Sequence, residues 1–294
     1  MIGRLGALAA RFEAHSLRVK ARLQDERERH VSVDVALRAA DRDAEVGGGI
    51  LAGALAYRLF VWMLPLLFVA VAGLGFYSEA SSQSPSAVAR SMGVAGIVSN
   101  SIAAAARGSA RWYALLIGVP VLLYATRTLL RSLIVVHRLV WAHTRRAAPR
   151  PTVRMTLETL VLLVGFPVIS GLASAVRAWS SGSGVLASLI IVIPYAGLWL
   201  IISARLPHRE ARWPALLPGA LLFAAGLEGL RFFTVYFLAP RVPSLQHSYG
   251  PLGIAAALFL GLFVIGRLVV LSAVTNAVLW ERRTAPLEER APDR

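Results

Sequence analysis

The sequence predicts an all-α integral membrane protein with six transmembrane helices, and three observations lead to this fold class. First, 56% of the 294 residues are hydrophobic and only 16% are charged, whereas about a quarter of the residues in a soluble domain are charged. Second, apolar stretches of about twenty residues or more recur along the chain, and a soluble protein of this length could not bury them all. Third, arginines gather in alternate connections between these stretches, as the positive-inside rule describes.

Residues 1–46 are predicted to form an amphipathic helical arm on the cytoplasmic side. They hold half of the 16 acidic residues of the chain together with several basic ones. Apolar residues recur in the arm at helical spacing, with arginines between them: Leu5, Leu8, Phe12, Val19 and Leu23. The arm either lies on an anionic membrane surface or is an ordinary cytosolic helix packed on the rest of the protein. We expect no cleavable signal peptide, because Arg11 and Glu13 interrupt the first apolar run.

Six apolar segments follow, and each is long enough to cross about 30 Å of hydrocarbon as a helix, at about 1.5 Å per residue. They cover approximately residues 49–77, 112–136, 153–176, 184–204, 213–238 and 251–280. A spanning segment must satisfy its backbone hydrogen bonds internally, which favours helices. The alternating pattern of an outer-membrane barrel does not occur in the sequence. Residues 47–280 therefore form the predicted transmembrane domain.

The distribution of arginines predicts that both termini are cytoplasmic. Arginines crowd the connection after the second segment, the connection after the fourth, and the tail 281–294, which we expect to be disordered. The alternate connections carry fewer arginines, so we expect them to face outward. The first of these, about residues 78–111, is long and rich in small residues. We expect it to form one or two short helices against the outer membrane surface.

Arginines inside the predicted spans are the main candidates for a binding site, because ionisable groups there are costly unless they are paired or hydrated. Arg58, Arg127, Arg131 and Arg267 fall in the inner half of the bundle, with Glu158 as the only acid. A cavity lined by these arginines would favour an anion, since arginine binds phosphate or carboxylate in a bidentate manner. Two alternatives stay open. Arg127 and Arg131 could extend their long side chains to the cytoplasmic interface, and Arg58 could bond to backbone carbonyls.

Two further features of the spans are candidates for a gate. Glu228 and Arg231, three residues apart in the fifth segment, are expected to form an ion pair, either purely structural or acting as an outer gate. Pro65, Pro120 and Pro194 interrupt the first, second and fourth segments. A proline frees a backbone carbonyl and permits a kink, which suits a gated cavity, although proline is also simply common in membrane helices.

The residues that common enzyme chemistries require are missing. The chain has no cysteine, its six histidines are scattered, and no Asp occurs between residues 44 and 292. Two-metal and zinc hydrolysis need clustered Asp, Glu and His ligands, and no P-loop, nucleophile elbow or dinucleotide-binding motif is present. We therefore expect no metal, no cofactor and no enzymatic activity. We attribute the net charge of +15 to membrane flanks rather than to nucleic-acid binding.

Three stretches within residues 40–280 resemble the YihY/BrkB family of bacterial inner-membrane proteins, formerly mislabelled ribonuclease BN. They are an Ala-Tyr…Pro-Leu signature in the first span, a Tyr-Gly-x-Leu-Gly turn before the last span, and an Asn-Ala close of that span. The matching residues are Tyr57, Pro65, Tyr249, Gly250, Gly253 and Asn276. The resemblance implies a six-helix inner-membrane protein associated with envelope integrity, for which transport of lipids or lipid-linked glycans has been suggested.

Two functional hypotheses from different classes follow. The favoured one is an inner-membrane protein that binds, and in its stronger form translocates, an anionic amphiphile such as a phospholipid or a lipid-linked envelope precursor, with the four arginines on its head group. The alternative is a non-transporting scaffold or envelope-integrity factor that acts through its arm and outer loop. An exporter of a soluble anion and a membrane-embedded hydrolase rank below both. The expected partners are membrane lipids, and a homo-oligomer is compatible with either hypothesis.

Overall fold

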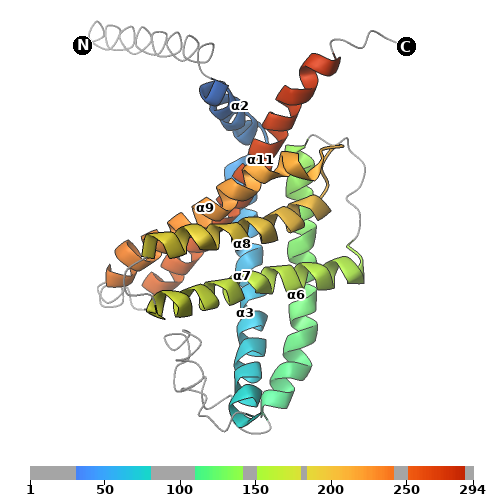
Figure 1. Ribbon diagram of the computed structural model, residues 1–294. Helices are drawn as coiled ribbons and strands as arrows, with labels where there is room; N and C mark the ends of the chain where they lie inside the picture. The colour runs from blue at the N-terminus through green and yellow to red at the C-terminus, as the bar shows by residue number, and fades with distance from the viewer. Residues whose placement is uncertain (1–30, 81–109, 142–150, 180–183, 242–250, 289–294) are drawn as a thin grey trace, which may run out of the picture.

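The computed structural model describes residues 31–80, 110–141, 151–179, 184–241 and 251–288, and every regular element among them is helical (Figure 1). The elements are α2 (Val31–Glu45), α3 (Gly48–Ala80), α6 (Ala110–Val140), α7 (Val153–Trp179), α8 (Gly184–Arg205), η1 (Trp213–Leu216), α9 (Leu217–Phe233), η2 (Thr234–Leu238), η3 (Ala239–Arg241) and α11 (Pro251–Glu288). The predicted all-helical class is confirmed for these residues. The first part of the arm and most of the predicted outer loop 78–111 lie outside them.

Five helical stretches of the described chain are long and apolar enough to cross a membrane. They are Gly48–Gly73, Leu115–Val140, Val153–Leu172, Trp213–Leu238 and Ala255–Thr284. The remaining predicted span, 184–204, corresponds to α8, whose described apolar part, Ile190–Arg205, is shorter. The protein therefore has the helices of a membrane protein, while the count of six spans and the cytoplasmic position of both termini stay predictions.

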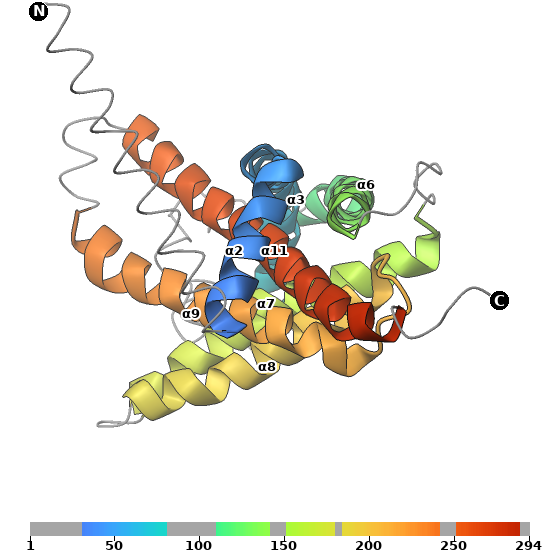
Figure 2. The same cartoon turned by 90° about the horizontal axis from the view of Figure 1, so that it is seen from above.

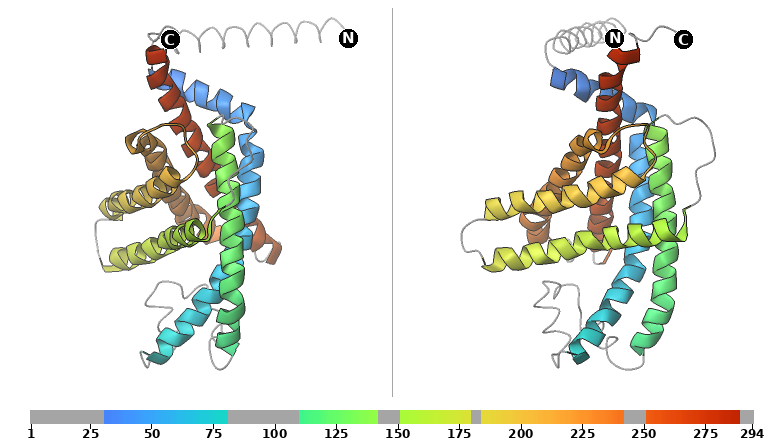
Figure 3. Two further views of the ribbon diagram at one scale, coloured as in Figure 1. Left: turned by 90° about the vertical axis from the view of Figure 1, so that its right-hand side faces the viewer. Right: turned by 45° about the vertical axis from the view of Figure 1, so that its right-hand side comes forward.

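The long helices pack in a closed ring, from α6 to α3, α11, α9, α8, α7 and back to α6. α3 and α6 form a long antiparallel pair, and α7 and α8 run side by side across the direction of that pair (Figure 1 and Figure 3). α9 and α11 run obliquely and complete the ring. Because these helices cross rather than run parallel, they share one core at the crossing and diverge toward their ends.

α11 approaches both of its main neighbours at backbone distance. A Cβ on Gly266 would lie 2.5 Å from the carbonyl oxygen of Ala52 in α3. On α9, the N–H of Gly219 donates a hydrogen bond of 2.8 Å to Oδ1 of the buried Asn276 of α11. Small residues permit such contacts in membrane proteins, where van der Waals packing and interhelical hydrogen bonds drive association. The two glycines therefore fix α11 between α3 and α9.

The helices differ from the predicted spans mainly at their ends. α11 continues to Glu288, past the predicted end of the last span at 280, so the prediction of a disordered tail is wrong for the first part of residues 281–294. The fifth span is not one α-helix, because it begins with the 3-10 turn η1 and ends with the π-helical turn η2. Pro65, Pro120 and Pro194 lie inside α3, α6 and α8, which continue through them; their role as kinks stays a prediction.

We predict that Gly266→Ala destabilises the protein by about 1–3 kcal/mol, the usual cost of an extra methyl group that meets fixed atoms. The matched control is Gly261→Ala on the same helix, since a Cβ there meets no atom within 4 Å. The melting temperature in mild detergent, followed by tryptophan fluorescence, should fall for the first variant only. Equal melting temperatures for the two variants would contradict the close approach of α11 to α3.

The absence of native cysteine allows a direct test of the predicted topology. We expect single cysteines at Ser82→Cys and Ser181→Cys to react with a membrane-impermeant maleimide in intact spheroplasts. Cysteines at Glu210→Cys and Arg283→Cys should react only after lysis, because the positive-inside rule predicts that arginine-rich connections face the cytoplasm. Labelling of positions 181 and 210 from the same side would show that α8 does not cross the membrane.

Candidate functional site

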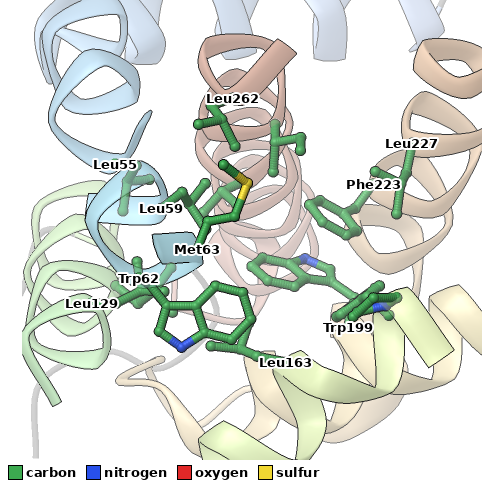
Figure 4. A pocket seen from close by; sticks show the side chains of 15 residues that line it. Leu55, Leu59, Trp62, Met63, Leu129, Leu163, Trp199, Phe223, Leu227 and Leu262 are labelled. Carbon is green, nitrogen blue, oxygen red and sulfur yellow. The ribbon is translucent and has the colours of Figure 1, made fainter. Parts of the chain in front are cut away.

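An apolar cavity of about 170 Å³ lies where the long helices meet. Each helix of the ring contributes side chains to its wall, several of which are labelled in Figure 4. One lining residue from each helix is Leu59 of α3, Leu129 of α6, Leu163 of α7, Trp199 of α8, Phe223 of α9 and Leu262 of α11. The cavity is therefore the point on which the fold converges.

The two indoles of the cavity wall have their polar atoms satisfied by other helices. Nε1 of Trp62 donates to Oγ1 of Thr126 at 2.9 Å, and Nε1 of Trp199 donates to Oγ of Ser272 at 2.7 Å. The ring of Trp199 also stacks on Phe223, with centroids 4.1 Å apart. No indole N–H is left to bond a ligand, so the cavity presents hydrocarbon surface. Such a cavity stays dry and accepts apolar groups.

The wall of this cavity contains none of the four arginines that the sequence predicts as a cavity lining. Arg267 forms a bidentate ion pair with Asp43 of α2 instead, with Nη1–Oδ1 and Nη2–Oδ2 distances of 3.0 and 2.9 Å. The two side chains keep 26% and 17% of their surface exposed. A Cβ on Gly48 would collide with Oδ1 of Asp43, so this glycine makes room for the pair. Arg267 is therefore already neutralised within the chain.

A second arginine fastens α2 to the same end of the bundle. Nε of Arg42 donates to the carbonyl oxygen of Val140 at the end of α6, at 3.1 Å. Its Nη2 donates to Oε1 of Glu281 in α11 at 3.2 Å. In Figure 2, α2 lies across α11 beside the start of α3. The part of the predicted arm that the structure describes is thus packed on the protein.

Arg58, Arg127 and Arg131 lie at similar depth along the antiparallel α3–α6 pair. The hydrogen bond between Trp62 and Thr126 sets the register of this pair. Measured from that bond toward the α2 end, Arg58 is about 6 Å away along its helix, Arg127 about 1.5 Å and Arg131 about 7.5 Å. Arg127 and Arg131 are exposed and Arg58 is half-buried. The structure therefore brings three of the four predicted cations to within about 6 Å of one another along the axis of this pair, but outside the cavity.

These three arginines differ from the other charged residues of the spans in lacking an acid. Among the described residues, no carboxylate lies within ion-pair distance of Arg58, Arg127 or Arg131. The guanidinium carbon of Arg58 instead lies 5.9 Å from the centroid of the Tyr57 ring. The contrast singles out these arginines as the polar part of the candidate site.

The acids Glu228 and Glu158 of the spans are both paired with arginines. Arg231 holds Glu228 in a bidentate pair, with Nε 2.9 Å from each carboxylate oxygen. Glu158 accepts hydrogen bonds from Arg154 and Arg205 at 2.9 and 2.6 Å. The ion pair of Glu228 and Arg231 is formed, while its action as a gate stays a prediction. Within the described ranges, no cluster of three His, Cys, Asp or Glu side chains could hold a metal ion.

Comparison with known proteins identifies the family of the chain. A family model described as "Virulence factor BrkB" matches residues 43–294. The chain belongs to the BrkB family. This confirms the resemblance that the motif residues indicate, and the match begins at Asp43, the partner of Arg267. Searches of curated proteins and of solved structures each return no match.

The structure describes four of the six residues that suggest BrkB membership. Asn276 binds the backbone of α9 through Gly219, and Pro65 is buried within α3. Tyr57 is exposed beside Arg58. Gly253 is buried near the start of α11. Tyr249 and Gly250 lie outside the described residues.

Sequence reasoning missed the partner of Arg267 and the apolar cavity. Asp43 was grouped with the cytoplasmic arm, although an acid just before a span is where a partner for a buried arginine can be sought. The cavity has no comparable signal, because its wall uses common apolar residues from all six helices. Only their arrangement in space distinguishes them from the rest of the core.

We predict that Arg267→Gln lowers stability by about 1–3 kcal/mol, less than a fully buried broken pair costs because both groups keep some exposure. The substitution leaves Asp43 without its cation. The double variant Asp43→Asn with Arg267→Gln should recover part of the loss, since no charge is then left unpaired. The melting temperatures of Arg267→Gln, Asp43→Asn and the double variant, each compared with that of the wild type, measure how strongly the two residues are coupled. Strict additivity would show that the pair contributes nothing to stability.

Proposed function

We propose that this BrkB-family protein binds an anionic amphiphile, a phospholipid or a lipid-linked envelope precursor, and translocates it across the bacterial inner membrane. The observation that carries the proposal is the set Arg58, Arg127 and Arg131, three cations within about 6 Å along the axis of the α3–α6 pair and without a carboxylate partner in the described chain. Cations at that depth need an anion or water. The phosphate of a lipid head group supplies the anion, and guanidinium groups bind it in a bidentate manner.

The depth of Arg127 argues against simple extension of its side chain to the membrane surface. Arg127 precedes Val140, the last residue of its apolar stretch, by about 20 Å along the helix. This distance is large beside a hydrocarbon core of about 30 Å. A head group that travels along the exposed side of α6 would meet Arg127 and Arg131 in turn, while its tails stay in the bilayer.

The rest of the proposed mechanism needs no covalent chemistry. The chain lacks nucleotide-binding motifs, so movement of the lipid is passive, ion-coupled or driven by a partner. We propose that both termini are cytoplasmic, which orients the α2 end of the bundle toward the inner leaflet. The ion pair of Glu228 and Arg231 then belongs to the outer half, where it can act as a gate.

We predict that Arg127→Gln combined with Arg131→Gln reduces retention of anionic phospholipid by about tenfold or more, since each charged hydrogen bond is worth about 1.4 kcal/mol or more. The measurement is native mass spectrometry of the gently solubilised full-length protein with lipid identification. The matched control is Arg283→Gln, an exposed arginine in the last turns of α11. Adding Arg58→Gln should deepen the loss.

Identical lipids on the wild type, the triple variant and the control would refute the proposal. That result would favour the scaffold hypothesis. One structural observation also favours this hypothesis. α2 is tied to α6 and α11 by Arg42 and to α11 by Asp43, which gives the arm a fixed position from which to present a binding surface. Deletion of residues 1–30, which leaves α2 intact, should then impair function more than loss of the arginines.

A further inference from the structure

A long apolar groove of about 510 Å³ separates the end of α9 from the first half of α11. One wall consists of residues of α9 and η2, among them Phe233 and Leu238, and the other of residues of α11, among them Leu258 and Gly261. In Figure 2, α9 and α11 spread apart toward this end of the molecule. The groove therefore follows from the oblique crossing of the two helices.

The side chains that line the groove are apolar, with one exception. Thr234 is the polar side chain in its lining, and the hydroxyl of this residue already donates to the carbonyl oxygen of Leu230 at 2.8 Å. Both walls belong to stretches that can cross a membrane, 213–238 and 255–284. In the membrane, the groove therefore opens toward lipid hydrocarbon.

Along α11, the groove is about as long as one leaflet of a bilayer is thick. Its lining on α11 runs from Gly253 to Ile265, which is about 18 Å at 1.5 Å per residue. Half of a hydrocarbon core of about 30 Å is about 15 Å. A single extended acyl chain fits this dimension, and in the proposed orientation the leaflet is the outer one.

The groove adjoins the cavity at the centre of the ring. Leu262 and Ile265 line both spaces and so stand between them. The other end of the groove is bordered by η2. Both sides of this partition are apolar.

We propose that this groove binds one acyl chain of a bilayer phospholipid, which enters between α9 and α11 and ends against Leu262 and Ile265. The site goes beyond the proposed function, because it recognises the lipid tail and accepts a neutral phospholipid equally well. It shares no residue with Arg58, Arg127 and Arg131. The two sites can therefore be tested separately.

Gly261 offers a way to fill the groove without disturbing the fold. It lines the groove, and a Cβ on it meets no atom within 4 Å. Gly261→Phe places a ring in the space that the acyl chain would occupy. Gly73→Phe on α3 is the matched control, because Gly73 is exposed, has the same freedom and lines neither space.

The test uses full-length protein in nanodiscs of phosphatidylcholine that contain a phosphatidylcholine with a photoactivatable group in one acyl chain. After illumination, we expect label on peptides 230–238 and 253–265, including Leu262 and Ile265, above the level on exposed residues of α6 such as Leu116. Label in the groove should fall about fivefold or more in Gly261→Phe, because the added ring occupies the space, and stay unchanged in Gly73→Phe. Gly261→Leu serves as a second variant if the phenylalanine lowers the melting temperature.

Three outcomes would overturn the inference. They are label spread evenly over all lipid-facing helices, label in the groove that Gly261→Phe and Gly261→Leu leave unchanged, and cross-links that show a second copy of the chain in the groove. The arginine triple variant should retain groove labelling, since the probe lipid has no net charge. Loss of anionic lipid binding with intact groove labelling supports both sites, whereas intact labelling without any arginine effect removes only the proposed function.

Discussion

The position of α11 is the constraint on which the rest of the structure depends. In lipid, no hydrophobic effect pulls helices together, so association relies on close packing and on hydrogen bonds between helices. Gly266 allows α11 to approach the backbone of α3 closely. Gly219 allows it to approach α9, where Asn276 of α11 accepts a hydrogen bond from the backbone N–H of Gly219. Once these contacts are made, the oblique crossing, the central cavity and the divergence of α9 from α11 follow. A family-motif asparagine thus has a structural explanation rather than a chemical one.

The charged residues of the membrane-spanning helices fall into two classes, which cannot be distinguished in the sequence. Arg267, Arg231 and Glu158 are bound to partners, whereas Arg58, Arg127 and Arg131 have no carboxylate within reach in the described chain. Pairing removes most of the cost of a charge in the membrane, so the first class is explained by the fold. The second class is not explained in this way, and the proposed lipid site rests on it. Apolar and cationic surfaces are separate here, so the two proposed sites are independent of each other.

Sequence reasoning predicted the helical class and the approximate positions of the five candidate spans, because long apolar runs are typical of helices that cross a membrane. It also predicted the family, from short motifs. It failed where the answer lay in the distance between residues far apart in the chain. Asp43 and Arg267 are 224 positions apart, so nothing local linked them, and the expected ring of four arginines around one cavity did not form. Leu59, Trp199 and Phe223 look like ordinary core residues in sequence, and only their convergence shows a cavity.

α11 has a mechanical consequence that follows from its length. With 38 residues, this helix is about 57 Å long, and it carries the acyl-chain groove near one end and the attachment of α2 near the other. The contacts described above all lie in one part of the helix: Gly266 meets Ala52, Arg267 binds Asp43, Asn276 binds Gly219, and Glu281 binds Arg42. α11 is thus held like a cantilever, clamped from Gly266 onward, and the groove runs along the part of the helix before Gly266.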